Sequence, residues 1–187
     1  MAETKTPDGA IAEKPKRRRI SKRKAVEQQA RSYFEAMARR DTHAMVEHWS
    51  ADGVLDIVPV GILRGREEIQ EFFRATFAAL PDAETTLTRV VAGDSSAAAE
   101  WRLAGHFTGA PFQGIDPTGK PVEVRGLDLI ELEGGEIVTL TAYYDGASFA
   151  RQVGMLPPEG SGAERAMMGA FNAVTKVRQA IAARTGS

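Results

Sequence analysis

The hydrophobic pattern of the chain changes its period at Asp82, and this change restricts the possible folds. Before Asp82 apolar side chains recur at helical spacing, and after it they alternate with the period of a half-buried strand. The alternating part contains four candidate strands, at residues 85–91, 97–107, 121–132 and 136–144. Gly93-Asp94, a Gly/Pro-rich loop at 109–119 and Gly134-Gly135 separate them, as is typical of turns. Helices followed by hairpin-linked strands predict an α+β fold, a curved antiparallel sheet with helices packed on one face.

Three candidate helices precede that sheet. The first begins at Ala25, a second short one is capped by Asp41 or Thr42, and the third runs over residues 65–80. A strand at 54–60 lies between the second and the third. We therefore expect one domain at residues 25–156.

The two ends of the chain differ from this domain. The window from Lys14 to Lys24 holds eight Lys or Arg in eleven residues, so residues 1–24 are expected to form a disordered basic extension. The alternative is a polybasic patch for nucleic acid, anionic lipid or an acidic partner, although no aromatic residue interleaves with the charges. Residues 157–187 are read as a linker and a last helix, which we expect to pack across the pocket mouth or against a second subunit.

Composition excludes several classes of protein. The 187 residues carry a net charge of −1, which gives the whole chain no bias towards nucleic acid or membrane. The absence of cysteine excludes disulfides, thiolate metal sites and a cysteine nucleophile. No stretch approaches the roughly 18 apolar residues of a membrane span. The sequence predicts a cytoplasmic protein without metal or organic cofactor.

One carboxylic acid interrupts an apolar strand face. Side chains alternate along a strand, so Asp128 shares a face with Val122, Val124, Ile130 and Leu132. An unpaired buried carboxylate is costly, and such a group usually takes a proton or finds a donor. Asp128 is therefore either a protonated acid that donates a hydrogen bond in an apolar pocket or a structural residue. In the second case backbone N–H groups or an arginine would satisfy it.

Two further polar residues are candidates on similar grounds. Tyr33 lies on the apolar stripe of the first helix, where a buried hydroxyl needs a partner, although many such tyrosines are only core residues. Asp56 shares a strand face with Val54, Val58 and Val60, so it points either inward or to a wet edge.

The order of these features resembles the ketosteroid isomerase and polyketide cyclase (SnoaL-like) branch of the nuclear-transport-factor-2-like (NTF2-like) superfamily. The similarity is carried by YFEAMARRDTHAMVEHWSADG (33–53), PVG (59–61), GREEIQEFF (65–73), LPD (80–82), PTGKPVEVRGLDLIEL (117–132), GGEIVTLTAYYD (134–145) and QVG (152–154). The resemblance implies a cone-shaped fold, with the N-terminal helices on the concave face of the sheet, around one apolar pocket.

The resemblance also implies roles for single residues. Isomerases of this family use a tyrosine on the first helix and a protonated aspartic acid on a late strand as an oxyanion hole, an arrangement that is itself a standard example of pKa tuning. Tyr33 and Asp128 match these positions. The position of the proton-shuttling base is Val58 here, so Asp56 or Asp145 would move the proton.

Related enzymes of the superfamily place their acids differently. The polyketide cyclases use an acid on the last strand, and alignment on YYD puts that position at Ala142. The epoxide hydrolases need two acids bridged by an arginine. We therefore expect an isomerase or cyclase that acts on a small hydrophobic, polyketide- or steroid-like carbonyl compound. Two alternatives stay open, a non-catalytic binding module and an epoxide hydrolase. The residues expected to contact the substrate are Met37, Trp49, Val58, Phe73, Trp101, Phe107 and Tyr143, in a chain expected to form a homodimer.

Overall fold

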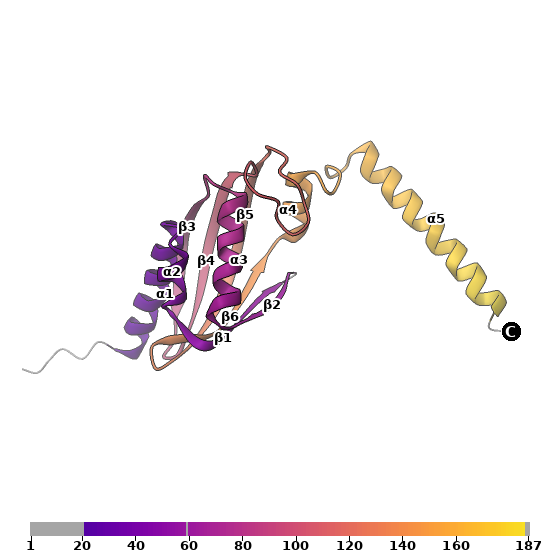
Figure 1. Ribbon diagram of the computed structural model, residues 1–187. Helices are drawn as coiled ribbons and strands as arrows, with labels where there is room; N and C mark the ends of the chain where they lie inside the picture. Colours follow the sequence, from indigo (N-terminus) through magenta and orange to yellow (C-terminus); the bar gives the residue numbers. More distant parts are fainter. Residues whose placement is uncertain (1–20, 59, 186–187) are drawn as a thin grey trace, which may run out of the picture.

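In the computed structural model, which describes residues 21–58 and 60–185, the helices within residues 22–153 gather on one side of a curved six-stranded sheet, and the last helix projects away from it (Figure 1). The helices are α1 (Lys22–Ala38), α2 (Thr42–Val46), α3 (Gly65–Ala79), α4 (Gly146–Val153) and α5 (Gly162–Thr185). The strands are β1 (Trp49–Val58), β2 (Gly61–Arg64), β3 (Glu84–Ala92), β4 (Ser96–His106), β5 (Pro121–Glu133) and β6 (Glu136–Tyr144). This layout confirms the α+β fold that the change of period predicts.

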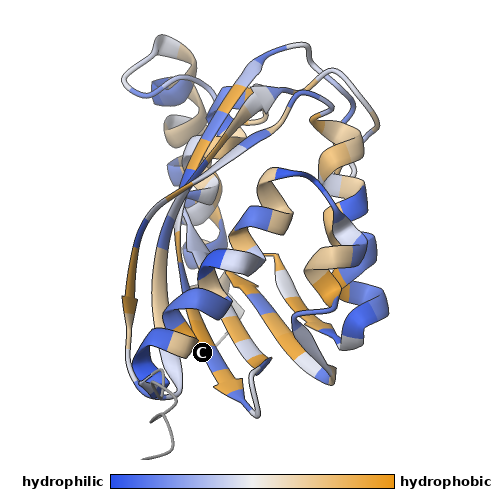
Figure 2. Ribbon diagram, turned by 90° about the vertical axis from the view of Figure 1, so that its left-hand side faces the viewer, coloured by the Kyte–Doolittle hydropathy of each residue, from blue (hydrophilic) through white to orange (hydrophobic). Residues whose placement is uncertain are grey.

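The strands lie in the order β2-β1-β6-β5-β4-β3. Four of the five pairings are antiparallel, but β1 runs parallel to β6, with Leu55 opposite Leu140. The expectation of a wholly antiparallel sheet is therefore wrong at this pair. A parallel pair needs a long crossover connection, and here α3 and the four strands β2, β3, β4 and β5 supply it. The alternation of apolar and polar residues along the strands is visible in Figure 2.

The inner face of the sheet packs against α1 and α3. Buried side chains of α1, among them Ala30, Tyr33 and Phe34, join those of β1, β4, β5 and β6 in one core. At the start of α3 the guanidinium of Arg66 donates to the carbonyl of Trp49 and forms an ion pair with Glu136 at 3.2 Å. Because these partners lie at the beginnings of β1 and β6, this contact holds the first turn of α3 beside the parallel pair.

The first helix begins three residues earlier than its apolar stripe indicates. Ser21 is the N-cap, and its hydroxyl accepts the N–H of Lys24 at 3.3 Å. Residues 22–24 are therefore helical and do not belong to a disordered extension, because a capping serine followed by lysine and arginine favours helix without needing burial. The rest of the predicted basic extension, residues 1–20, lies outside the described residues.

The C-terminal part holds two helices. The short helix α4 ends at Gly154, which adopts the left-handed conformation (φ 90°) that favours glycine. After it α5 projects away from the sheet and does not lie across the helices or the pocket (Figure 1). The expectation that α5 covers the pocket mouth of its own chain is therefore wrong. None of the described helices is long and apolar enough to cross a bilayer.

Candidate active site

A cavity opens between α1, α3 and the inner face of the sheet. The empty space inside it, counted together with the open mouth, is about 940 Å³. Its wall is almost entirely apolar and aromatic. The lining residues are Tyr33, Met37, Leu55, Ile57, Phe72, Phe73, Thr76, Ala79, Leu80, Trp101, Leu103, Phe107, Phe112, Gln113, Val122, Val124, Asp128, Leu140, Ala142, Tyr144 and Phe149.

Asp128 is the one carboxylic acid in this lining among the described residues. Its side chain is only 4% exposed. In the strand register Asp128 stands between Ala99 of β4 and Ala142 of β6, so its two neighbours on the same face are small. Ala142, the residue that alignment on YYD predicts at the acid position of the cyclases, is therefore adjacent to Asp128, and its methyl group adds no polar atom beside the carboxyl group.

Trp101 holds the carboxyl group of Asp128. Its indole Nε1 donates to Oδ1 of Asp128 at 2.7 Å. Trp101 is paired with Gly126 on the neighbouring strand, and a Cβ on Gly126 would lie 2.6 Å from Cε2 of the indole. The missing side chain of Gly126 thus lets the indole lie across β5 and reach Asp128, two residues further along the same face.

Burial raises the pKa of Asp128 from 3.8 to about 7, and the hydrogen bond from Trp101 moves it in the opposite direction. The described residues contain no ion pair to Asp128. Arg102 and Arg125, the arginines that the sequence offers as partners, lie on the outer face. Arg102 pairs with Glu123 at 2.7 Å. Burial without a cationic partner is therefore the cause of the raised pKa of Asp128.

Tyr33 is the second polar group of the cavity. It is fully buried, and its hydroxyl has no hydrogen-bond partner among the described residues. Burial raises the pKa of Tyr33 well above 10, the negative charge of Asp128 adds to this, and the neighbouring indole N–H of Trp49 opposes it. The phenol therefore keeps its proton and can donate it in a hydrogen bond to a ligand.

The cavity contains four of the residues expected to contact a substrate. They are Met37, Phe73, Trp101 and Phe107. A fifth, Trp49, is buried but does not line the cavity, and it packs edge-on against Tyr33 with 6.1 Å between ring centroids. Trp49 thus supports the tyrosine from behind.

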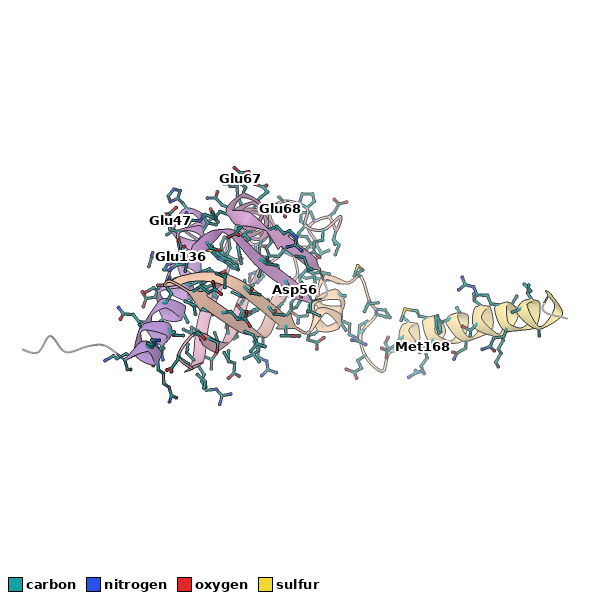
Figure 3. The ribbon with its side chains drawn as sticks, turned by 90° about the horizontal axis from the view of Figure 1, so that it is seen from below. Glu47, Asp56, Glu67, Glu68, Glu136 and Met168 are labelled. Atoms are coloured by element: carbon teal, nitrogen blue, oxygen red, sulfur yellow. The ribbon has the colours of Figure 1, made fainter. Side chains whose placement is uncertain are left out.

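Three expected site residues lie on the opposite face of the sheet. Leu55 and Ile57 are buried and line the cavity, so Asp56 and Val58, which alternate with them along β1, lie on the outer face. Figure 3 labels Asp56. Tyr143 is 47% exposed, while its neighbour Tyr144 lines the cavity. The expected inward direction is wrong for Val58 and Tyr143, and of the two directions left open for Asp56 the structure has the outward one. Both faces of β1 and β6 carry apolar residues, so alternation alone does not choose between them.

Asp145 also lies outside the cavity lining. Its carboxylate accepts the N–H of Ser148 at 2.9 Å and caps α4. A proton shuttle through Asp56 or Asp145 is therefore not supported. The epoxide hydrolase pattern is contradicted as well, because the lining among the described residues has one acid and no arginine.

Several lining residues were not expected from the sequence. Examples are Leu55, Ile57 and Tyr144. Alternate residues of a strand share a face, so these residues could have been identified once one inward residue of each strand was known. Within residues 21–58 and 60–185, no three His, Asp or Glu side chains are grouped as metal ligands would be.

Solved structures with this fold are numerous. A candidate SnoaL-like polyketide cyclase from Jannaschia sp. CCS1 is 18% identical with a TM-score of 0.67, covering 74% of this chain and 98% of that one. IdmH, a candidate polyketide cyclase from Streptomyces antibioticus, is 24% identical with a TM-score of 0.59, covering 68% and 97%. A protein with a ketosteroid-isomerase-like fold from Catenulispora acidiphila DSM 44928, in complex with trimethylamine, is 24% identical with a TM-score of 0.58, covering 70% and 98%.

These likenesses confirm the NTF2-like fold, and at such identities they show the fold alone. The comparison with curated protein sequences finds no match. The model of the SnoaL-like domain matches residues 30–140, which is more than half of the chain and includes β1 to β5, the residues around Asp128 and the first part of β6. The chain therefore belongs to the SnoaL-like domain family.

Proposed function

We propose that the cavity is the active site of an isomerase or cyclase that acts on a small hydrophobic carbonyl compound through an enolate. The observation that carries this proposal is the state of Asp128. It is a buried acid in an apolar cavity, it has no cationic partner among the described residues, and its pKa is about 7. A general acid or base works best when its pKa is near the working pH.

In this mechanism Asp128 moves the proton itself. The ionised carboxylate takes a proton from the carbon next to the substrate carbonyl, and the C–H electron pair becomes the enolate. The negative charge collects on the carbonyl oxygen, to which the Tyr33 hydroxyl donates a hydrogen bond. Asp128 then returns its proton to another carbon in an isomerase. In a cyclase the enolate carbon attacks a second carbonyl of the same molecule, and the new alkoxide takes the proton.

This assignment gives Asp128 a different role from the one that the family resemblance implies. A permanently protonated acid would need a second residue to move the proton, and the cavity lining offers no other carboxylic acid among the described residues. Trp101 supports the new role, because a hydrogen bond to the ionised form stabilises the base. Aromatic walls from Phe72, Phe107 and Tyr144 favour a ring-shaped substrate.

Hydrogen–deuterium exchange tests this proposal without knowledge of the natural substrate. Cyclic ketones with an acidic α-hydrogen are incubated with the protein in D₂O, and loss of the α-proton signal is followed by NMR. We expect Asp128→Asn to slow the catalysed exchange by about 10² to 10⁴ and Tyr33→Phe by about 10². Asp56→Asn is the matched control, since it removes the charge of an aspartate on the outer face, and it should exchange at the parent rate.

A non-catalytic binding module is the second candidate. It is favoured by the lone acid in the cavity lining, since proton transfer between distant atoms usually uses two groups. In that case the parent protein would bind cyclic ketones with no exchange above the buffer rate, and Asp128→Asn would leave this rate unchanged. Catalysed exchange that disappears in Asp128→Asn while ketone affinity is kept would exclude the binding module.

A further inference from the structure

The helix α5 presents an apolar stripe that nothing else in the described chain covers. Met167, Phe171, Val174 and Val177 recur at spacings of three or four residues, so they share one side of the helix. They are between 41% and 64% exposed. Asn172 and Lys176 lie on the opposite side. Met168, at the edge of the stripe, is labelled in Figure 3 far from the sheet that bears Asp56. A contiguous exposed apolar surface of this kind marks a contact site.

The outer face of the sheet carries a second exposed apolar surface. The register places Val58, Tyr143 and Leu127 side by side on β1, β6 and β5, and Leu129 lies next along β5. All four are between 41% and 47% exposed. We call these four residues the outer sheet patch. Asp56 lies beside Thr141 in the following row, so an acid borders the patch.

The junction before α5 directs the helix away from its own sheet. Arg151 of α4 and Glu164 of α5 form an ion pair at 3.1 Å whose side chains are partly buried. The same carboxylate accepts the N–H of Gly160, and the Ser161 hydroxyl accepts the N–H of Glu164. Returning α5 to the outer sheet patch of the same chain would break these contacts, because α5 would have to reverse its direction.

We propose that the apolar stripe of α5 packs on the outer sheet patch of a second copy of this chain. The stripe and the patch have similar dimensions. The stripe from Met167 to Val177 is about 15 Å long, and the three adjacent strands β1, β6 and β5 are together about 10 Å wide. Charges agree too. Arg178 flanks the stripe, and Asp56 and Glu131 border the patch with no ion pair to any described residue. Reciprocal exchange of the two helices makes a closed two-fold dimer.

Disulfide mapping tests this inference, and the chain suits it because it has no cysteine. One copy carries Phe171→Cys, a second copy with a different tag carries Leu129→Cys, and the two are mixed and oxidised. We expect a disulfide between the differently tagged chains. Asn172→Cys, on the opposite side of α5, is the matched control and should give little cross-linking with Leu129→Cys.

The stripe of α5 could instead be covered by its own chain, by a second α5 or by a lipid surface, and each alternative gives a distinct experimental result. A double variant with both cysteines that closes a disulfide within one chain would show that α5 folds back, and this overturns the proposal. Disulfides that form only between two Phe171→Cys chains would show helix pairing and also overturn it. So would a monomeric parent protein whose α5 binds vesicles of anionic phospholipid.

Light scattering provides a second measurement. The parent protein is expected to be a dimer, and Val174→Asp should shift it to the monomer because a charge then meets the outer sheet patch. Asn172→Asp adds the same charge on the opposite side and should remain a dimer. If Val174→Asp remains a dimer, the proposal is wrong, whatever the outcome for the pocket.

Discussion

Trp101 and Asp128 form the central contact of the pocket, with indole Nε1 donating to carboxyl Oδ1 at 2.7 Å. No hydrogen bond of the described residues engages Oδ2 of Asp128, so this oxygen is left for a ligand. The indole fixes the orientation of the carboxyl group and lowers its pKa, whereas burial raises it. The two effects together place the pKa near neutrality.

Replacing the donor tests this balance. Trp101→Phe keeps an aromatic ring but removes the N–H, so the ionised form of Asp128 loses a stabilising hydrogen bond and its pKa should rise further above 3.8. The rise of ketone exchange rate with pH should then move to higher pH. NMR titration of the Asp128 carboxyl carbon checks the shift directly, and an unchanged titration would contradict the assigned contact.

Adding one methyl group to Gly126 should displace the indole. A Cβ at this position would lie 2.6 Å from Cε2 of Trp101 and 2.7 Å from the carbonyl oxygen of Tyr143. We expect Gly126→Ala to lower the free energy of unfolding by about 1 to 3 kcal/mol, the usual cost of overpacking. Gly93→Ala is the control, because its nearest neighbour would be 3.5 Å away. Urea unfolding of both variants should separate them, and equal losses would argue against a close Trp101–Gly126 contact.

The raised pKa of Asp128 makes stability depend on pH in a defined direction. Between pH 3.8 and about 7 the native state holds a proton that the unfolded chain has released. The free energy of unfolding therefore falls as pH rises through this window, by about 4 kcal/mol in all, and this group adds no further change at higher pH.

Asp128→Asn removes that titration. Relative to this variant, the parent chain should lose about 2 to 3 kcal/mol between pH 5 and pH 8. Thermal or urea unfolding at both pH values measures the difference. Asp56→Asn serves as the control and should follow the parent chain, while a constant difference between parent and Asp128→Asn would show that Asp128 titrates at its ordinary value.

The loop that follows β4 is seated on the end of α3. The N–H of Gly109 donates to the carbonyl of Ala79 at 3.0 Å, and the N–H of Ala110 donates to that of Ala78 at 2.9 Å. A Cβ on Gly109 would overlap the carbonyl group of Ala78. Gly109→Ala should lift the loop, which carries the lining residue Phe112.

We expect this displacement to weaken ligand binding by about tenfold or more while the domain stays folded. Fluorescence of Trp101, which lines the cavity, can report binding of a cyclic ketone. Thr108→Ala, in the same loop but exposed, should bind like the parent chain. Unchanged affinity in Gly109→Ala would show that the loop does not shape the cavity.

Most elements of the fold were predictable because their apolar residues lie on one face of the helix or strand. The four strands predicted after Asp82 agree with the observed ones to within one residue at each end, because turn residues separate them clearly. The four-residue strand β2 was missed because it is too short to show a period. The expected position of Asp128 on the inner face follows from a strand with one polar and one apolar side.

The site was less predictable, and β1 shows why. Both faces of this strand are apolar, since one carries Val54 and Val58 and the other carries Leu55 and Ile57. The sequence therefore does not reveal which face is inside. The contact between Trp101 and Asp128 depends on the pairing of Trp101 with Gly126, a register that no local pattern contains. Val58 and Tyr143, whose direction was predicted wrongly for this reason, are exposed and belong to the outer sheet patch.

The parallel pairing of β1 with β6 also determines when the pocket can exist. Leu55 and Leu140 are neighbours in the sheet although 85 residues separate them in the chain. A ribosome must therefore release nearly the whole domain before the two strands meet, and contacts this distant in sequence form slowly. Before β6 is made, β1 and β2 have no link to β5, β4 and β3, which makes the late synthesis of β6 the step that completes the sheet.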